Sequence, residues 1–175
     1  MAGDIKLQYG ASVALTVTNL HSLASSQTWE AGWTSAAIDN GTNEYVDYLL
    51  TGTFTTHASN RQAGSINVYA YAALNDTPTW PDLFSAGTEA TEGTATVHDT
   101  EQRDSGMRFV ASMTVDTGAS EVYTFQPISI AALFGGIVPD QFAIFVAQNA
   151  STTTTAGLAS SGSALYYTPV HYQYT

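Results

Sequence analysis

The stretch GSINVYAYAALN, residues Gly64–Asn75, decides the fold class. Apolar side chains occupy every second position, and asparagine and tyrosine fill most of the positions between them. Because side chains alternate between the two faces of a β-strand, this pattern predicts a strand with one apolar face and one polar face that carries the pair Tyr69 and Tyr71. A helix would scatter these residues around its circumference. The Asn-Asp-Thr-Pro sequence that begins at Asn75 predicts that the strand ends in a turn.

The same alternation recurs along the chain and predicts about eight strands with no helix of useful length. A single all-β domain follows, an antiparallel jelly-roll-like sandwich or barrel with minimal helix. Mixed long and short connections favour the jelly roll over an up-and-down barrel. We expect residues 1–10 to form an N-terminal arm and residues 11–175 to form the sandwich. The predicted strands are Val13–Thr18, Tyr45–Thr56, Gly64–Asn75, Thr94–His98, Gly106–Asp116, Glu121–Phe125, Gln141–Gln148 and Ala164–Thr175.

Local signals add two expectations about how these strands meet. The loop between Tyr45–Thr56 and Gly64–Asn75 is short, which predicts that the two strands pair as an antiparallel hairpin. Gly32 lies between Trp29 and Trp33 and predicts a bulge or a close approach of another backbone.

Two connecting segments are less regular. Within residues 76–105 we expect one turn of helix after Pro81, where proline is tolerated, and an exposed acidic loop over residues 87–104. The segment Pro127–Gly136 is compatible with either a buried strand or one or two helical turns, and its glycine pair ends the element in both cases.

The composition disfavours several classes of partner. Only 11% of the residues are charged, and the net charge is −11. Nucleic-acid binding needs a basic patch that four cations do not readily supply, and an anionic membrane surface is disfavoured for the same reason. No apolar run approaches the ~18 residues of a membrane span, and the first residues lack the pattern of a signal peptide. We therefore expect neither nucleic acid nor a membrane as partner. The four cations are Lys6, Arg61, Arg103 and Arg108.

Catalytic and metal-binding motifs are missing from the sequence. The four histidines are His21, His57, His98 and His171, and no two of them have the i,i+2 or i,i+4 spacing of metal ligands. The chain has no cysteine, no G-x-S-x-G motif and no glycine-rich phosphate loop. A β-fold that gathers histidines, or a carboxylate pair for glycoside hydrolysis, stays an open alternative. We expect no catalytic residue, no cofactor, no metal and no disulfide.

Aromatic residues are the stronger functional signal. Aromatic side chains on a β-surface suit either a protein interface or stacking on sugar rings, and simple core packing explains about half of them. The aromatic residues in question are Trp29, Trp33, Trp80, Tyr69, Tyr71, Tyr166, Tyr167, Tyr172 and Tyr174. The arm adds apolar residues in alternation, which suits strand addition to the sheet edge of a neighbour. The candidate interface residues are Ile5, Leu7, Tyr9, Tyr166, Tyr167, Tyr172 and Tyr174.

Four stretches give the chain the style of a small virion protein: the start MAGD, the pair YVDYLLTGTFTT and GSINVYAYAALN, the strand QFAIFVAQNAS and the ending SGSALYYTPVHYQYT. Together they resemble the capsid decoration (cement) proteins of tailed bacteriophages that have a jelly-roll or related β-barrel fold. The resemblance implies a non-enzymatic protein, made in the host cytoplasm, that binds the major capsid protein on the outer capsid surface and stabilises the head. The alternative is a carbohydrate- or receptor-binding β-domain of a tail fibre or of a polysaccharide-acting protein.

We also expect self-association. The strand Gln141–Gln148 is apolar on both faces and the C-terminal end is rich in tyrosine, so both need more cover than one sandwich supplies. Closed cyclic symmetry is the default for homo-oligomers. The resemblance to decoration proteins implies a homotrimer in particular.

Overall fold

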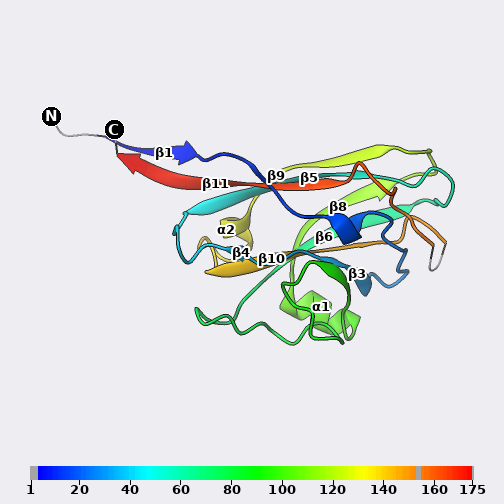
Figure 1. Cartoon of the computed structure of the whole chain (residues 1–175), viewed down its shortest axis with the longest axis horizontal. Coiled ribbons are helices and arrows are strands. Elements are labelled where there is room, and N and C mark those ends of the chain that lie inside the picture. The colour runs from blue at the N-terminus through cyan, green and yellow to red at the C-terminus, as the bar shows by residue number, and fades with distance from the viewer. Residues whose placement is uncertain (1–3, 153–154, 175) are drawn as a thin grey trace.

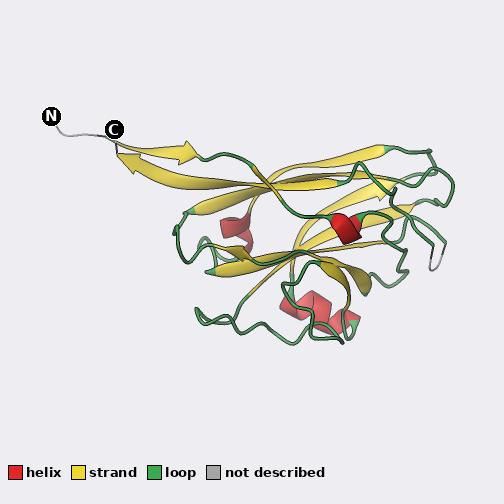
Figure 2. Cartoon of the chain, in the orientation of Figure 1, coloured by secondary structure: helices red, strands yellow, loops and turns green. Residues whose placement is uncertain are grey.

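Two antiparallel sheets face each other in the computed structural model, which describes residues 4–152 and 155–174 (Figure 1 and Figure 2). The first sheet contains β1 (Ile5–Tyr9), β2 (Val13–Ala14), β5 (Asp47–Thr55), β9 (Val122–Ser129) and β11 (Ala164–Tyr174). The second contains β3 (Ala31–Thr34), β4 (Ile38–Asp39), β6 (Gly64–Ala72), β7 (Gly93–Thr96), β8 (Arg108–Val115) and β10 (Gln141–Gln148). The helices are η1 (Thr18–Leu20), α1 (Thr100–Gly106) and α2 (Ile130–Leu133). The all-β prediction with minimal helix is confirmed.

Eight of these strands pair in the order of a jelly roll. When β2, β3, β5, β6, β8, β9, β10 and β11 are counted from one to eight, the first sheet has the order 1-8-3-6 and the second has 2-7-4-5. The predicted hairpin between Tyr45–Thr56 and Gly64–Asn75 is wrong, because β5 pairs with β9 and β11 whereas β6 pairs with β8 and β10. The loop between them crosses from one sheet to the other, so their apolar faces meet across the core.

The main core fills the space between the two sheets. Alternate residues of β5 and β6 point into it, and Leu50, Phe54, Ile66 and Val68 are all fully buried there. Burial of one such side chain contributes roughly 1.5–3 kcal/mol relative to exposure, which explains why these positions are apolar. β6 ends at Ala72, three residues before the predicted end, and Leu74 is exposed.

A second apolar cluster covers the other face of the second sheet. Tyr71 of β6 and Phe145 of β10 are fully buried there against Phe84, which belongs to the segment of residues 73–92, largely green and lying below the sheet in Figure 1. The Tyr71 hydroxyl lies 2.6 Å from Thr34 Oγ1 and accepts a hydrogen bond from the Ala90 N–H, and burial raises the pKa of Tyr71 to about 12. The prediction that this face of β6 is a polar surface is therefore wrong.

The second cluster also accounts for the apolar character of β10. Phe142, Ile144 and Val146 pack in the main core, whereas Ala143 and Phe145 pack in the second cluster. The chain therefore covers both faces of this strand by itself. The expectation that Gln141–Gln148 needs a neighbouring subunit for cover is wrong.

Carboxylates of the acidic segment accept hydrogen bonds from backbone N–H groups of the same part of the chain. Glu89 Oε1 accepts hydrogen bonds from the backbone N–H groups of Leu83 and Phe84 at 3.0 and 2.8 Å. Asp99 Oδ1 accepts from the Gln102 N–H at 2.7 Å and caps α1. The prediction of a helical turn after Pro81 is thus wrong. The helix of this segment is α1, which follows the cap residue Asp99.

The segment Pro127–Gly136 combines both alternatives that its sequence allows. Its first residues end β9, and α2 follows as a single turn. The Ser129 hydroxyl caps this turn by accepting from the Ala132 N–H at 3.1 Å. Gly135 and Gly136 have φ values of 80° and 95°, which few residues other than glycine adopt, and they stop the helix.

Glu92 joins η1 to the second sheet. Its Oε1 accepts from Trp33 Nε1 at 2.8 Å and from the Asn19 N–H at 2.9 Å, and its Oε2 accepts from Asn19 Nδ2 at 2.8 Å. Burial acts to raise the pKa of this carboxyl, but the hydrogen bonds from Trp33 and Asn19 together outweigh it. The net result is a pKa of Glu92 below its ordinary value.

This contact predicts a pH dependence of stability. Because the pKa of Glu92 is lower in the folded state, its contribution is complete above the unfolded pKa of about 4.3 and is lost as the pH falls through the folded pKa. Between about pH 5 and pH 3, the wild type should therefore lose more thermal stability than Glu92→Gln, which cannot titrate there. Melting temperatures of both proteins across this range measure the difference, since the other carboxylates titrate alike in the two. Parallel curves would contradict the prediction.

Candidate functional site

A two-stranded ribbon projects from one end of the sandwich. β1 pairs with the last residues of β11, from Tyr9 opposite Val170 to Ile5 opposite Tyr174. β11 pairs with β5 only up to Val170, so β1 and residues 171–174 extend beyond the body of the protein, at the left in Figure 1. We call β1 together with residues 170–174 the ribbon. The arm expected at residues 1–10 is thus paired, over its described strand, with the C-terminal end of its own chain.

The ribbon has one apolar and one polar face. Residues directly opposite each other in an antiparallel pair point to the same side, and successive residues alternate. The apolar face of the ribbon therefore consists of Ile5, Leu7, Tyr9, Tyr172 and Tyr174, with exposed fractions between 52% and 72%. The polar face consists of Lys6, Gln8, His171 and Gln173.

The other two predicted interface residues separate. Tyr166 lies an even number of residues from Tyr172 on β11 and so shares the side of the apolar face, where it is 39% exposed. Tyr167 points the opposite way and packs against the main core, with its ring 5.6 Å from that of Tyr48. Six of the seven predicted residues therefore lie on the outer face of the first sheet, and Tyr167 does not.

The outer face of the first sheet is nearly free of charge. Of the side chains that strand register places on it from β1, β5 and β11, only Asp47 is charged. Asp47 Oδ1 accepts hydrogen bonds from the N–H groups of Tyr48 and Ala131 at 2.8 and 2.9 Å. Most of the other residues are threonine, tyrosine or aliphatic. Depleted charge with enriched tyrosine is the composition of an interface core.

Several aromatic residues that the sequence offered as surface candidates are core residues. Trp33 and Tyr71 are fully buried, and Tyr69 is 7% exposed. Trp29 and Trp80 are partly buried and pack against the second cluster. None of the three tryptophans therefore supplies a fully exposed platform. The sequence could not separate Tyr69 and Tyr71 from the ribbon tyrosines because both pairs alternate along strands.

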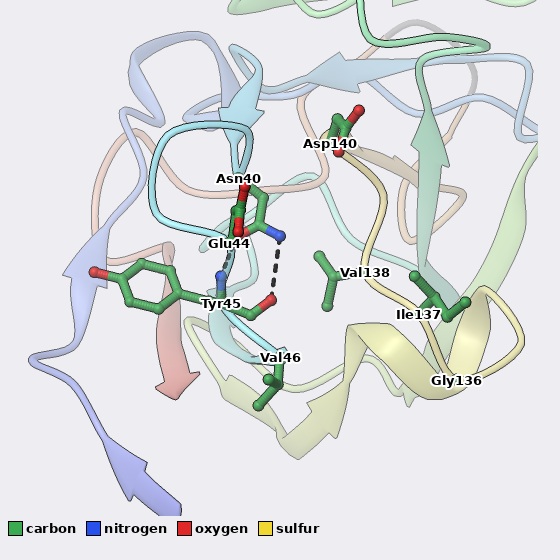
Figure 3. Close-up of a pocket in the computed structure, with 8 residues that line it drawn as sticks. All are labelled: Asn40, Glu44, Tyr45, Val46, Gly136, Ile137, Val138 and Asp140. Atoms are coloured by element: carbon green, nitrogen blue, oxygen red, sulfur yellow. Dashed lines mark hydrogen bonds between the residues drawn. The ribbon is translucent and has the colours of Figure 1, made fainter. Parts of the chain in front are cut away.

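A cavity of about 380 Å³ opens beside the base of the ribbon (Figure 3). The side chain of Asn40 accepts a hydrogen bond from the N–H of Tyr45 and donates one to its C=O, which fixes the wall of the cavity. The Tyr45 ring lies 5.8 Å from that of His171. Ile137 also lines the cavity and is 77% exposed. The sequence does not identify it as a site residue, and its only local signal is the glycine pair directly before it. The lining residues are Asn40, Glu44, Tyr45, Val46, Gly136, Ile137, Val138 and Asp140.

Within residues 4–152 and 155–174 the structure shows no metal-binding set. No three histidine or acidic side chains in that part of the chain lie close enough to hold a metal ion. His98 pairs with Asp82 at 3.2 Å on the surface, whereas His21 contacts the Ser163 carbonyl. Over the same residues, no helix has both the length and the apolar character to cross a membrane.

Comparisons with known proteins give no match: models of protein families, curated proteins and solved structures all lack a significant similarity to this chain. The candidate site is therefore argued from its own geometry.

Proposed function

We propose that the protein is a non-enzymatic structural component of a bacteriophage virion that binds the outer surface of the capsid and stabilises the head. The observation that carries the proposal is the nearly uncharged outer face of the first sheet with its projecting ribbon. This surface suits attachment to another protein, and no group of side chains that could hold a metal ion accompanies it among the described residues. The resemblance to decoration proteins supplies the identity of the partner, the major capsid protein, and the homotrimeric state.

The jelly-roll order of the strands supports the proposal at the level of architecture. Jelly rolls recur in capsid proteins, but they also recur in lectins, so the fold alone does not choose a function. The ribbon favours the structural role because its apolar face combines aliphatic and aromatic side chains, as protein interfaces do.

Removal of the arm is expected to abolish attachment while leaving the fold intact. A variant that begins at Ala11 lacks β1 but keeps the eight jelly-roll strands, and the residues lost from the described strand are exposed or partly buried. It should unfold within a few degrees of the wild type and bind capsids at least about tenfold more weakly, because the ribbon loses one of its two strands. Co-sedimentation with purified capsids that lack the protein measures the binding.

The control is Phe109→Ala, which removes a 54% exposed side chain from the second sheet instead. It should bind as the wild type does. An arm-deleted protein that co-sediments normally, or one that is unfolded, contradicts the assigned role of the arm.

The alternative is a carbohydrate- or receptor-binding β-domain. The exposed rings of Tyr9, Tyr172 and Tyr174 on one face of the ribbon favour it, since sugar rings stack on such surfaces. The burial of Trp33 and Tyr71 disfavours it, because the larger aromatic platform is absent. A glycan array separates the two functions, and cryo-electron microscopy of virions that carry the protein tests the capsid location directly.

A further inference from the structure

We propose that the apolar face of the ribbon packs against the same face of the ribbon in another copy of this chain. The proposal rests on the self-association included in the proposed function, and it names the residues that form the contact. Because the same face meets itself, the contact is isologous and joins two copies, in place of the three that the resemblance to decoration proteins implies. The surface is that of Ile5, Leu7, Tyr9, Tyr172 and Tyr174.

The exposed area is the first argument. From the exposed fractions of its three tyrosines and two aliphatic residues, the apolar face of the ribbon covers on the order of 600 Å². A patch of this size lies at the upper end of what soluble monomers expose, about 300–600 Å². Two such faces in contact would bury roughly 1,200 Å², which reaches the range of specific protein interfaces.

The stability of the ribbon is the second argument. Beyond Val170, β11 pairs with β1 alone, so the two strands form an isolated pair. A two-stranded antiparallel pair is marginally stable in water, and packing of one face against another apolar surface stabilises it. A second ribbon supplies that surface with matching dimensions, because sheets pack face to face at a spacing of about 10 Å.

The distribution of charge favours the ribbon as the place where two copies of the chain meet. The chain carries a net charge of −11, so two copies repel each other wherever their acidic surfaces approach. The apolar face of the ribbon carries no charge, and the only lysine of the chain, Lys6, lies on its polar face. Since the ribbon projects from the body (Figure 1), copies that meet ribbon to ribbon keep their acidic bodies apart. Separations beyond about 8 Å are largely screened at physiological salt.

The oligomeric mass of point variants tests the proposal. Leu7→Glu and Tyr172→Glu place a carboxylate on the apolar face, and Gln173→Glu adds the same charge to the polar face of the same strand pair. Sedimentation velocity should give a wild-type mass of about twice the chain mass of 18.5 kDa. The first two variants should associate at least about 100-fold more weakly, because a buried unpaired charge is costly, and Gln173→Glu should match the wild type. Circular dichroism should be the same for all four.

A mixing experiment distinguishes a contact between two ribbons from a contact between the ribbon and another part of the neighbour. Tagged Leu7→Glu is incubated with untagged wild type and then captured. If both partners must present an intact apolar face, no wild-type protein is retained. Retention would overturn the proposal, because it would mean that a wild-type ribbon docks on a different surface.

Two further results would also overturn it: a wild type that stays monomeric at about 100 µM, or variants on the two faces that weaken association equally. Capsid binding is measured separately on the same proteins. A monomeric wild type that still binds capsids removes this inference and leaves the proposed function. An oligomer held by the ribbon that binds no capsid leaves this inference and removes the proposed function.

Discussion

Replacement of Gly32 by alanine is expected to lower the free energy of unfolding by about 3 kcal/mol or more. Gly32 pairs with Ala147 where β3 meets β10. A Cβ atom at this position would lie 2.3 Å from the carbonyl oxygen of Val146 and 2.6 Å from the ring of Phe145. The carbonyl belongs to the backbone of a central strand, so relief requires the separation of two strands rather than a side-chain rotation.

Gly93→Ala is the matched control, since Gly93 lies in the neighbouring strand β7 and a Cβ there would meet no atom within 4 Å. Its effect should stay within about 1 kcal/mol, because alanine is no worse than glycine in a strand. Urea unfolding followed by tryptophan fluorescence measures both variants. Equal stability of the two would contradict the close approach at Gly32.

Replacement of Phe145 by alanine should cost about 3–5 kcal/mol, the usual range for a fully buried phenylalanine. Its ring lies 5.4 Å from that of Phe84 and 6.2 Å from that of Tyr69, so its loss leaves a cavity between the second sheet and the segment that covers it. The same segment should then detach more readily, and limited proteolysis within residues 74–92 should become faster.

Phe109→Ala serves again as the control. The Phe109 ring also lies near that of Tyr69, at 5.6 Å, but Phe109 is 54% exposed, so its removal should cost about 1 kcal/mol or less. If both phenylalanine variants lost the same stability, the second cluster would not be a core. The prediction matters for function, because it tests whether the chain covers β10 without a partner.

Most strands followed from the sequence, although β3 and β4 did not, and the face of each strand did not always follow either. Strict alternation along Gly106–Asp116 would place Phe109 and Met113 on the same face. The pairing of β8 with β6 shifts between Val68 and Tyr69, and this bulge inserts Val110 into the alternation. Val110 and Met113 then point into the main core, whereas Phe109 points to the other side. A bulge depends on the partner strand, so periodicity within one strand cannot reveal it.

The candidate site shows the same division. Alternation at Ile5, Leu7 and Tyr9 predicted that they share one face of an extended arm, and their common side in β1 agrees with this. The partner of that arm lies more than 160 positions away in the sequence, at the end of β11. Hydrogen bonds between strands use backbone groups that every residue carries, so the side chains alone could not identify this pairing.

The sequence by itself determined that this chain forms strands, that each strand has an apolar face, and that few charges are available for a basic or catalytic surface. These properties are local, since they depend on side-chain periodicity and composition. The tertiary structure decided which sheet each strand joins, that residues 73–92 cover the second sheet, and that Tyr167 is internal while Tyr166 is exposed. Two adjacent tyrosines must point to opposite sides of a strand, and only the register of β11 against β5, which sets Tyr167 opposite Leu50, determines which one enters the core.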